Sequence, residues 1–214
     1  NNGVGIYGES SKLENTGKIY LGDTQIVNEA DLSDEQNRYA VGIYGEKSVI
    51  KNSGEIIIGE KGIGIYSFQQ SGDIINSSSG KIISNGDNAV GIFSEMGNKE
   101  NGSKVKNDGV IQLNGANVVG VVLSNNGVLE NTGVIMVDGA NAVGVYAEKG
   151  SEIYNSGTIS AAGDKSILIV LKGNSKLVNT GILHLGAGAL GIVAADDGSD
   201  AGGYEKLSLT DVKI

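Results

Sequence analysis

A repeated Asn-x-Gly step constrains the fold of this chain more than any other feature. In the second half of the sequence its asparagine recurs every 24 residues (131−107, 155−131, 179−155). Further upstream the intervals are 37, 24 and 31 (52−15, 76−52, 107−76). The seven asparagines are Asn15, Asn52, Asn76, Asn107, Asn131, Asn155 and Asn179, and after Asn76 the glycine is delayed by two residues to Gly80. A fixed period with local stretching is typical of a solenoid.

Two kinds of short segment alternate within each repeat. One is of the Val-Gly-Ile-Tyr type, as in Val41–Tyr44, and the other surrounds the asparagine, as in Leu129–Val137. Both alternate with period 2 and are rich in glycine and β-branched residues, which favours strands with one buried face. Three short strands in about 24 residues predict a right-handed parallel β-helix of about eight coils, stacked roughly 4.8 Å apart. Residues 1–214 are expected to form a single β-helix segment of a longer chain.

The alternation also predicts which side chains point inward. Aliphatic residues flank the Asn-x-Gly step at fixed positions, for example Leu129, Ile135 and Val137, with Ser84 and Ala161 as smaller exceptions. In the other segment we expect two inward columns with an outward glycine column between them. The first column is Val4, Val41, Ile63, Val90, Val119, Val143, Ile167 and Leu190, and the second is Ile6, Ile43, Ile65, Ile92, Val121, Val145, Ile169 and Ile192. The glycines are Gly5, Gly42, Gly64, Gly91, Gly120, Gly144 and Gly191, and Leu168 interrupts them.

A leucine-rich repeat has a similar period and also carries an asparagine. Its pattern places leucine three and five residues before that asparagine, where this chain has Val128 and Asn126. No helical segment follows, so the β-helix is the better interpretation.

Composition excludes several classes of function. The formal net charge of −9 argues against a nucleic-acid partner, whose phosphates require a basic surface. The chain has no cysteine, which excludes disulfides and thiolate metal sites. No apolar run is long enough for a membrane-spanning helix.

Three departures from the period predict loop insertions, near residues 23–38, 95–104 and 194–206. Loops on a rigid scaffold often carry recognition, although such insertions are also tolerated without a function. The first insertion is polar and contains the candidate recognition residues Glu29, Asp31, Asp34, Glu35 and Arg38.

Few other residues are candidates for chemistry. We expect the asparagines to form a structural ladder, with the following glycine supplying a positive φ. His184 lies between two inward leucines and should face solvent, and Asp196, Asp197 and Asp200 form an acidic cluster that lacks a calcium-binding repeat. No catalytic, cofactor-binding or metal-binding residues are predicted.

An aromatic column is the second candidate recognition surface. Tyr7, Tyr44, Tyr66 and Phe93 occupy the same position in successive repeats. Such a strip could hold a sugar or a peptide, or its rings could simply stack on one another.

Alternating Val-Gly-Ile-Tyr-Gly and Asn-x-Gly-x-Ile segments, as at Val4–Gly8 and Val41–Gly45, closely resemble the passenger domains of the large type V autotransporter adhesins of fusobacteria. The resemblance covers the chain from Asn1 to about Gly191. It implies a passenger at the bacterial cell surface, joined to the outer membrane through a C-terminal β-barrel outside this sequence. The partners it implies are a host receptor protein, a glycan or other bacteria.

These observations leave three functional hypotheses. The first is a non-enzymatic adhesin segment that mediates attachment to host cells or other bacteria. The second is a polysaccharide lyase or hydrolase, because such enzymes also use right-handed β-helices. Its acid and base roles are hard to fill with one arginine and one exposed histidine. The third is a cytotoxin passenger, which would need a further domain.

Overall fold

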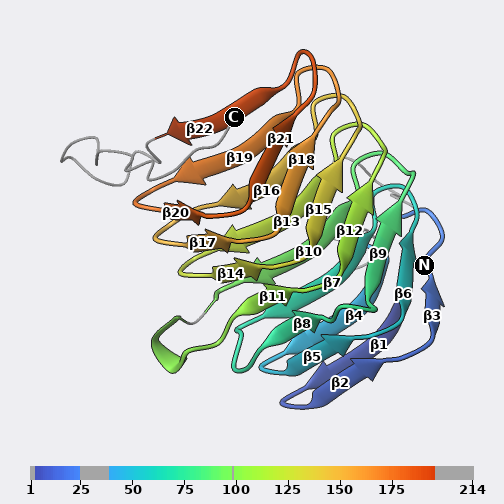
Figure 1. Cartoon of the computed structure of the whole chain (residues 1–214). Coiled ribbons are helices and arrows are strands. Elements are labelled where there is room, and N and C mark those ends of the chain that lie inside the picture. Colours follow the sequence, from blue (N-terminus) through green and yellow to red (C-terminus); the bar gives the residue numbers. More distant parts are fainter. Residues whose placement is uncertain (1–2, 25–38, 98, 196–214) are drawn as a thin grey trace, which may run out of the picture.

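The computed structural model describes residues 3–24, 39–97 and 99–195, and they form three parallel sheets wound into one rod (Figure 1). Sheet A has eight strands, in the order β1 (Val4–Glu9), β4 (Val41–Glu46), β7 (Ile63–Phe68), β10 (Val90–Glu95), β13 (Val119–Ser124), β16 (Val143–Ala147), β19 (Ile167–Lys172) and β22 (Leu190–Ala195). Sheet B has seven, β2 (Lys12–Asn15), β5 (Val49–Asn52), β8 (Ile74–Asn76), β11 (Val105–Asn107), β14 (Val128–Asn131), β17 (Glu152–Asn155) and β20 (Lys176–Asn179). Sheet C also has seven, β3 (Lys18–Tyr20), β6 (Glu55–Ile58), β9 (Lys81–Ser84), β12 (Val110–Leu113), β15 (Val134–Val137), β18 (Thr158–Ala161) and β21 (Ile182–Leu185).

Each coil contributes one strand to each sheet in the order A, B, C. Strands pair in parallel with their equivalents in the coils before and after, so that Ile111 lies beside Ile135 and Ile135 beside Ile159. The described residues comprise seven complete coils followed by β22. The parallel β-helix with three strands per coil is therefore confirmed; its right-handed winding stays a prediction from the crossover rule.

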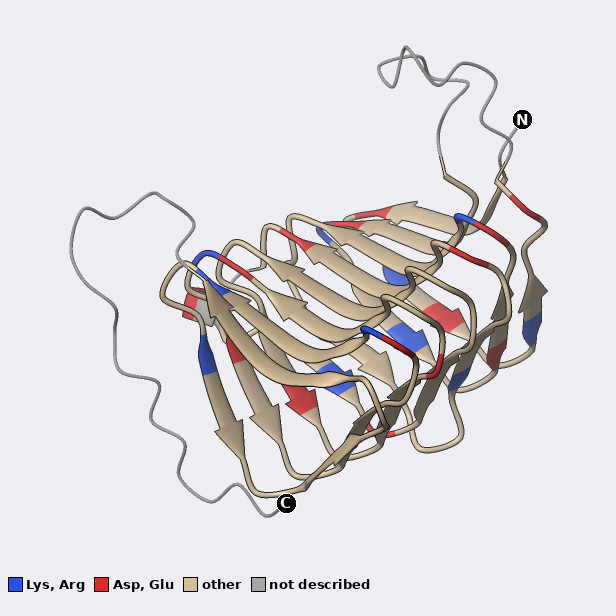
Figure 2. Ribbon diagram, turned by 90° about the horizontal axis from the view of Figure 1, so that it is seen from above, with Lys and Arg blue, Asp and Glu red and all other residues tan. Residues whose placement is uncertain are grey.

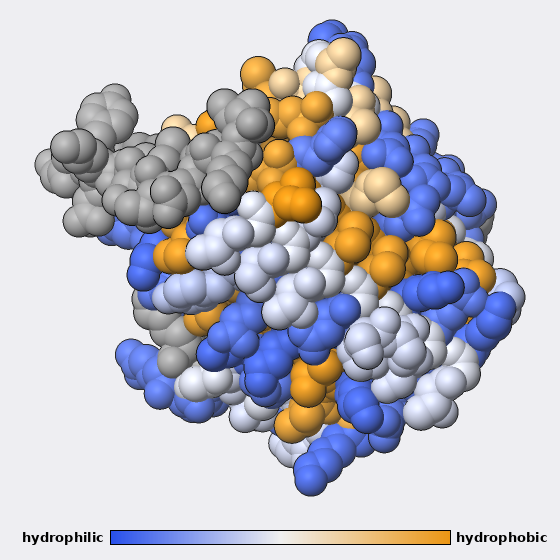
Figure 3. Space-filling view, viewed as in Figure 1, coloured by the Kyte–Doolittle hydropathy of each residue, from blue (hydrophilic) through white to orange (hydrophobic). Residues whose placement is uncertain are grey.

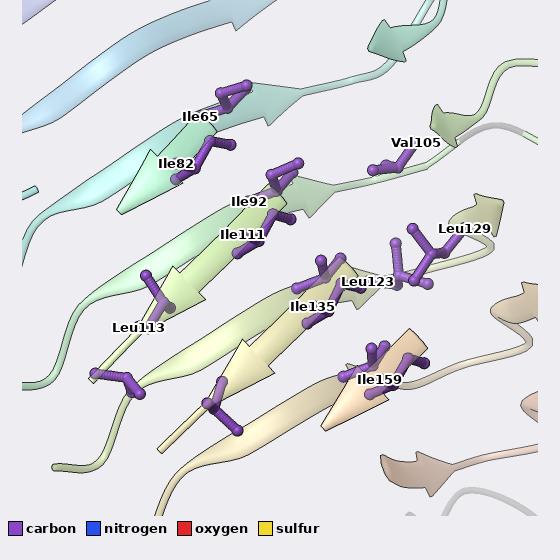
Figure 4. Packing of buried hydrophobic residues seen from close by; sticks show 14 of the residues in the cluster. Ile65, Ile82, Ile92, Val105, Ile111, Leu113, Leu123, Leu129, Ile135 and Ile159 are labelled. Atoms are coloured by element: carbon purple, nitrogen blue, oxygen red, sulfur yellow. The ribbon is translucent and has the colours of Figure 1, made fainter. Parts of the chain in front are cut away.

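The core is a set of aliphatic columns that run along the rod axis (Figure 4). Ile92, Ile111, Leu129, Ile135 and Ile159 are all fully buried, so the predicted inward columns around the Asn-x-Gly step and the Ile43 column are confirmed. Similar side chains stack from coil to coil because the registers align them, and no single coil could bury its apolar face alone.

The predicted outward direction of the glycine column is wrong. A Cβ built on Gly91 would lie 2.4 Å from the carbonyl oxygen of Gly120 and 2.8 Å from Ile111 Cγ2, which belongs to the core. Gly91 and Ile92 are both buried although they are adjacent, so the alternation shifts by one residue at the glycine. In the first six coils these glycines face the interior, where the carbonyl of the next sheet A strand and an isoleucine methyl group of sheet C occupy the space that a side chain would need. In the seventh coil the buried Leu168 takes this position.

The same shift makes the first predicted inward column partly wrong. Val41 and Ile63 are buried, but no member of that column belongs to the core cluster, and Val4 and Leu190 are exposed at the two ends of the described rod. Two other positions of this segment fill the core instead. One is the residue that precedes the first predicted column, and the other is the residue that follows the aromatic column. The first group includes Ala89, Val118 and Ala142, and the second Leu123, Ala147 and Leu171.

In the second to seventh coils, two of the three corners use a residue with positive φ. At the corner from sheet C to sheet A, Lys61, Asn88, Asn117, Asn141 and Lys165 have φ between 54° and 57°. The corner from sheet A to sheet B has a similar residue, for example Lys47 or Lys149. A single left-handed residue turns the chain sharply between two extended segments, and asparagine tolerates this conformation better than most residues.

Candidate binding surface

The aromatic column lies on the outer face of sheet A, where its rings form a continuous ladder over the first four coils. The ring centroids of Tyr7 and Tyr44 are 5.4 Å apart, those of Tyr44 and Tyr66 5.1 Å, and those of Tyr66 and Phe93 5.2 Å. The first and last pairs are stacked and the middle pair meets edge to face. The structure thus brings the four predicted aromatic residues together as one surface, called here the aromatic ladder. Val122 follows Phe93 in this register and ends the ladder.

A column of carboxylates borders the aromatic ladder on the same face. Glu9, Glu46 and Glu95 each stand two residues after a ring, and the pairing aligns Glu9 with Glu46. The Tyr66 hydroxyl donates a short hydrogen bond to Glu95. Burial, followed by this hydrogen bond and the negative charge of Glu95, raises the pKa of Tyr66 well above its ordinary value. The ring is therefore fixed and neutral, and the second oxygen of such a carboxylate can accept a hydrogen bond from a ligand.

These carboxylates are functional candidates that the sequence analysis missed. The sequence does contain a pattern that could have identified them, because these glutamates recur with the same period as the aromatic residues two positions before them. In the third coil Phe68 stands in place of the carboxylate, so no single residue type recurs at this position through all four coils.

The described ends of two insertions lie at opposite edges of sheet A, beside the same four coils. The first insertion joins β3 to β4, and its base is closed by Thr24 Oγ1, which accepts a hydrogen bond from Ala40 N at 3.0 Å. The second joins β10 to β11 and contains the short helix η2 (Lys99–Asn101). Tyr39 at the first base and Met96 at the second are exposed by 51% and 43%. The aromatic ladder is thus flanked on both edges by exposed apolar side chains.

Several predicted candidates fall outside the described residues. These are Glu29, Asp31, Asp34, Glu35 and Arg38 of the first insertion and Asp196, Asp197 and Asp200 near the end of the chain. A binding role for the residues of the first insertion stays a prediction.

The asparagine column is a structural ladder, as predicted. All seven side chains are buried, and the Nδ2 of each of the first six donates to the Oδ1 of the next asparagine at 2.6–2.9 Å. The predicted positive φ of the following glycine is wrong, since Gly133 and its equivalents do not have one. A Cβ on Gly133 would lie 2.2 Å from the carbonyl oxygen of Gly109, so this glycine permits close backbone stacking.

Charged side chains are interspersed along the rod (Figure 2). Lys51 pairs with Glu14 and Lys18 with Glu55, both at 2.8 Å and both between neighbouring coils. Exposed pairs of this kind add little stability. The faces visible in Figure 3, which include sheets B and C, mix polar with apolar side chains. His184 is exposed on sheet C, as predicted, and therefore does not lie with the aromatic ladder.

Two features are absent from the described residues. No group of three or more His, Cys, Asp and Glu side chains there is arranged to hold a metal ion. None of the helices in that part of the chain has the length and hydropathy needed to cross a membrane.

Fold and surface together define a class: a parallel β-helical domain whose sheet A carries an external aromatic ladder bordered by carboxylates. The chain matches the family described as the BigA third pectate lyase-like domain over residues 1–77 and 95–202. These segments cover most of the sequence, and the chain belongs to this family. Searches of curated proteins and of solved structures each returned no match.

Proposed function

We propose that this domain is a non-enzymatic adhesive segment of a bacterial surface protein, similar to an autotransporter passenger, that attaches the cell to host cells or other bacteria. The observation that carries the proposal is the aromatic ladder of Tyr7, Tyr44, Tyr66 and Phe93 on a rigid sheet. Stacked rings offer a preformed apolar platform, and the neighbouring carboxylates accept hydrogen bonds from sugar hydroxyls or peptide donors. The family match supports a β-helical domain of bacterial origin, and the sequence resemblance supports the cell surface.

The chemistry of the same face favours binding over catalysis. Hydrolysis or elimination on a polysaccharide needs an acid and a base that converge on one sugar. Glu95 accepts a hydrogen bond from Tyr66, and Glu148, further along the rod, accepts one from Tyr146 at 3.0 Å. These two carboxylates are thus each bound to the phenol of a neighbouring tyrosine, and neither is paired with a second carboxylate as an acid–base pair would be.

An adhesion assay tests the proposal. The immobilised chain should retain epithelial cells or partner bacteria, and the double variant Tyr44→Ala/Tyr66→Ala should lose most of this binding because the platform is interrupted in its centre. Tyr20→Ala is the matched control, since Tyr20 is 67% exposed on sheet C, away from the ladder. Retention of full adhesion by the double variant would contradict the proposal.

A polysaccharide lyase or hydrolase is the second candidate, and the description of the family as pectate lyase-like favours it. The two candidates separate in one experiment. Purified protein is incubated with polygalacturonate and with neutral polysaccharides, and reducing ends and unsaturated products are measured. Under the adhesive proposal no product accumulates, whereas turnover of either substrate would establish the enzyme.

A further inference from the structure

A hollow of about 250 Å³ lies at the corner between sheets B and C, on a different side of the rod from the aromatic ladder. Three consecutive coils line it, each with one residue from the outer face of sheet B and one from the turn that follows. The pairs are Glu130 with Thr132, Tyr154 with Ser156, and Val178 with Thr180. Asn131 and Asn155 of the buried asparagine ladder complete the lining, which gives the hollow a rigid base.

Tyr154 is held in one orientation at the centre of the hollow. Its hydroxyl donates to Glu152 Oε2 at 2.6 Å, and Lys176 Nζ lies 5.4 Å from the ring centroid. Tyr154 lines the hollow and neither Glu152 nor Lys176 does, so these two contacts fix the ring without filling the hollow beside it. A fixed aromatic surface of this kind can stack against an apolar face of a ligand at little cost in conformational entropy.

Three exposed hydroxyl groups form a row beside the ring, one per coil. Thr132 Oγ1 donates to Asp108 at 2.7 Å, and Thr180 Oγ1 makes a long contact of 3.4 Å with the Asn155 carbonyl. Ser156 Oγ has no hydrogen-bond partner among the described residues. Glu130 adds a carboxylate whose Oε1 is bound by Lys104. The row therefore offers both hydrogen-bond donors and hydrogen-bond acceptors, and its members are separated by the distance between neighbouring coils.

This combination fits a saccharide better than a peptide. A sugar ring has an apolar C–H face for the tyrosine and equatorial hydroxyls for the row, whereas Val178 alone would offer little to an apolar side chain. Neighbouring coils are about 4.8 Å apart, which is close to the length of one monosaccharide in an extended chain. No basic residue lines the hollow, and the Glu130 carboxylate is already paired with Lys104, so nothing in the lining would compensate the charge of a uronate.

We propose that this corner is a saccharide-binding site for an uncharged oligosaccharide lying along the rod, with Tyr154 as the stacking platform and Thr132, Ser156 and Thr180 as hydrogen-bonding groups. The site is independent of the adhesive role proposed for sheet A. It also differs from what the family description suggests, because it selects against acidic sugars such as those of pectate.

Titration by nuclear magnetic resonance tests the site on the full chain. The probes are β-1,4-linked tetramers of glucose and of N-acetylglucosamine, with tetragalacturonate as the acidic comparison. At least one neutral tetramer should shift the backbone amide signals of Thr132, Ser156 and Thr180, and tetragalacturonate should bind at least about tenfold more weakly. Tyr154→Ala should weaken binding by about tenfold or more, and Tyr154→Phe, which keeps the ring, by less than about threefold.

Tyr146→Ala is the matched control. Tyr146 occupies the same coil on sheet A, with a glutamate on its hydroxyl and Lys172 Nζ 5.6 Å from its ring, and it does not line the hollow. Its loss should leave the titration unchanged. The proposal is overturned if neither neutral tetramer shifts the three amides, if the Tyr154 and Tyr146 variants behave alike, or if the acidic tetramer binds best. Signals from the aromatic ladder are read separately in the same spectra, so failure at this corner does not bear on sheet A.

Discussion

At the scale of single residues, the asparagine ladder makes the most specific demand on the sequence. Asn131 accepts from Asn107 at 2.7 Å and donates to Asn155 at 2.7 Å, and it is fully buried. Asn131→Ala removes the ladder partner of Asn107 Nδ2, which keeps only the Val134 carbonyl, and of the buried Asn155 Oδ1. We expect the free energy of unfolding to fall by about 2–4 kcal/mol, measured by urea denaturation followed by circular dichroism.

Asn15 provides the comparison for this prediction. It stands at the first described coil and bonds one ladder neighbour, Asn52. Asn15→Ala should therefore cost about 1 kcal/mol. Equal losses for the two variants would mean that the ladder contributes no more in the interior than at its end.

The hydrogen bond between Tyr66 and Glu95 predicts a pH dependence. The pKa of Tyr66 is raised in the folded protein, so its phenol keeps its proton at a pH where the unfolded chain, with an ordinary value of 10.0, has lost it. Its contribution to stability is complete below about pH 10 and is lost as the pH rises towards the folded value. Thermal melts from about pH 9 to 11 should show a steeper fall for the native chain than for Tyr66→Phe. Parallel curves would show that Tyr66 titrates in the folded state as it does in the unfolded chain.

At the scale of elements, the stacking of neighbouring sheet A strands and their packing against sheet C both depend on the inward glycines. Gly91→Ala would place a methyl group 2.4 Å from the Gly120 carbonyl oxygen, which is backbone and has little freedom to move. We expect a loss of about 3 kcal/mol or more in the free energy of unfolding, again from urea denaturation. At Gly17 an added Cβ meets nothing within 4 Å, so Gly17→Ala is the control and should be nearly neutral. If Gly91→Ala were equally neutral, the glycine column would face outward after all.

The errors of the sequence analysis also belong to this scale. Period and residue type were sufficient to predict the strands, the stacked columns around Asn131 and the aromatic ladder, because each depends on an identity that recurs every coil. The inward direction of Gly91 was missed because counting alternate residues assumes an unbent strand, and the bend at the glycine is a property of the packed sheets. The left-handed corners were missed because Lys61 and Lys165 hold a conformation that their residue type does not favour.

The hydroxyl row escaped notice because serine and threonine beside a turn are common, and only the stacked coils show that Thr132, Ser156 and Thr180 adjoin one tyrosine.

At the scale of the whole molecule, the rod should behave as a sum of coils joined by similar interfaces. Deleting residues 132–155 removes 24 residues, which is the separation of Asn131 from Asn155. Asn131 would then precede Ser156, every inward column would keep its register, and β14 would be followed directly by β18. We expect a folded protein with an unchanged circular dichroism band shape, shorter by about 4.8 Å in small-angle X-ray scattering.

A deletion of residues 132–143, about half the period, is the control for that prediction. It joins Asn131 to Gly144 and moves sheet A residues into the place of sheet C, so the columns no longer match their neighbours and the coils beyond the junction should unfold. The full-coil deletion also removes Thr132 and Tyr154, and hence the hollow, while leaving the aromatic ladder of the first four coils intact. The shortened rod should therefore keep its adhesion to cells and lose its response to neutral tetramers. Loss of both activities in a folded rod would place the two functions on one surface, and unfolding of both deletion variants would show that a coil is not a separable unit.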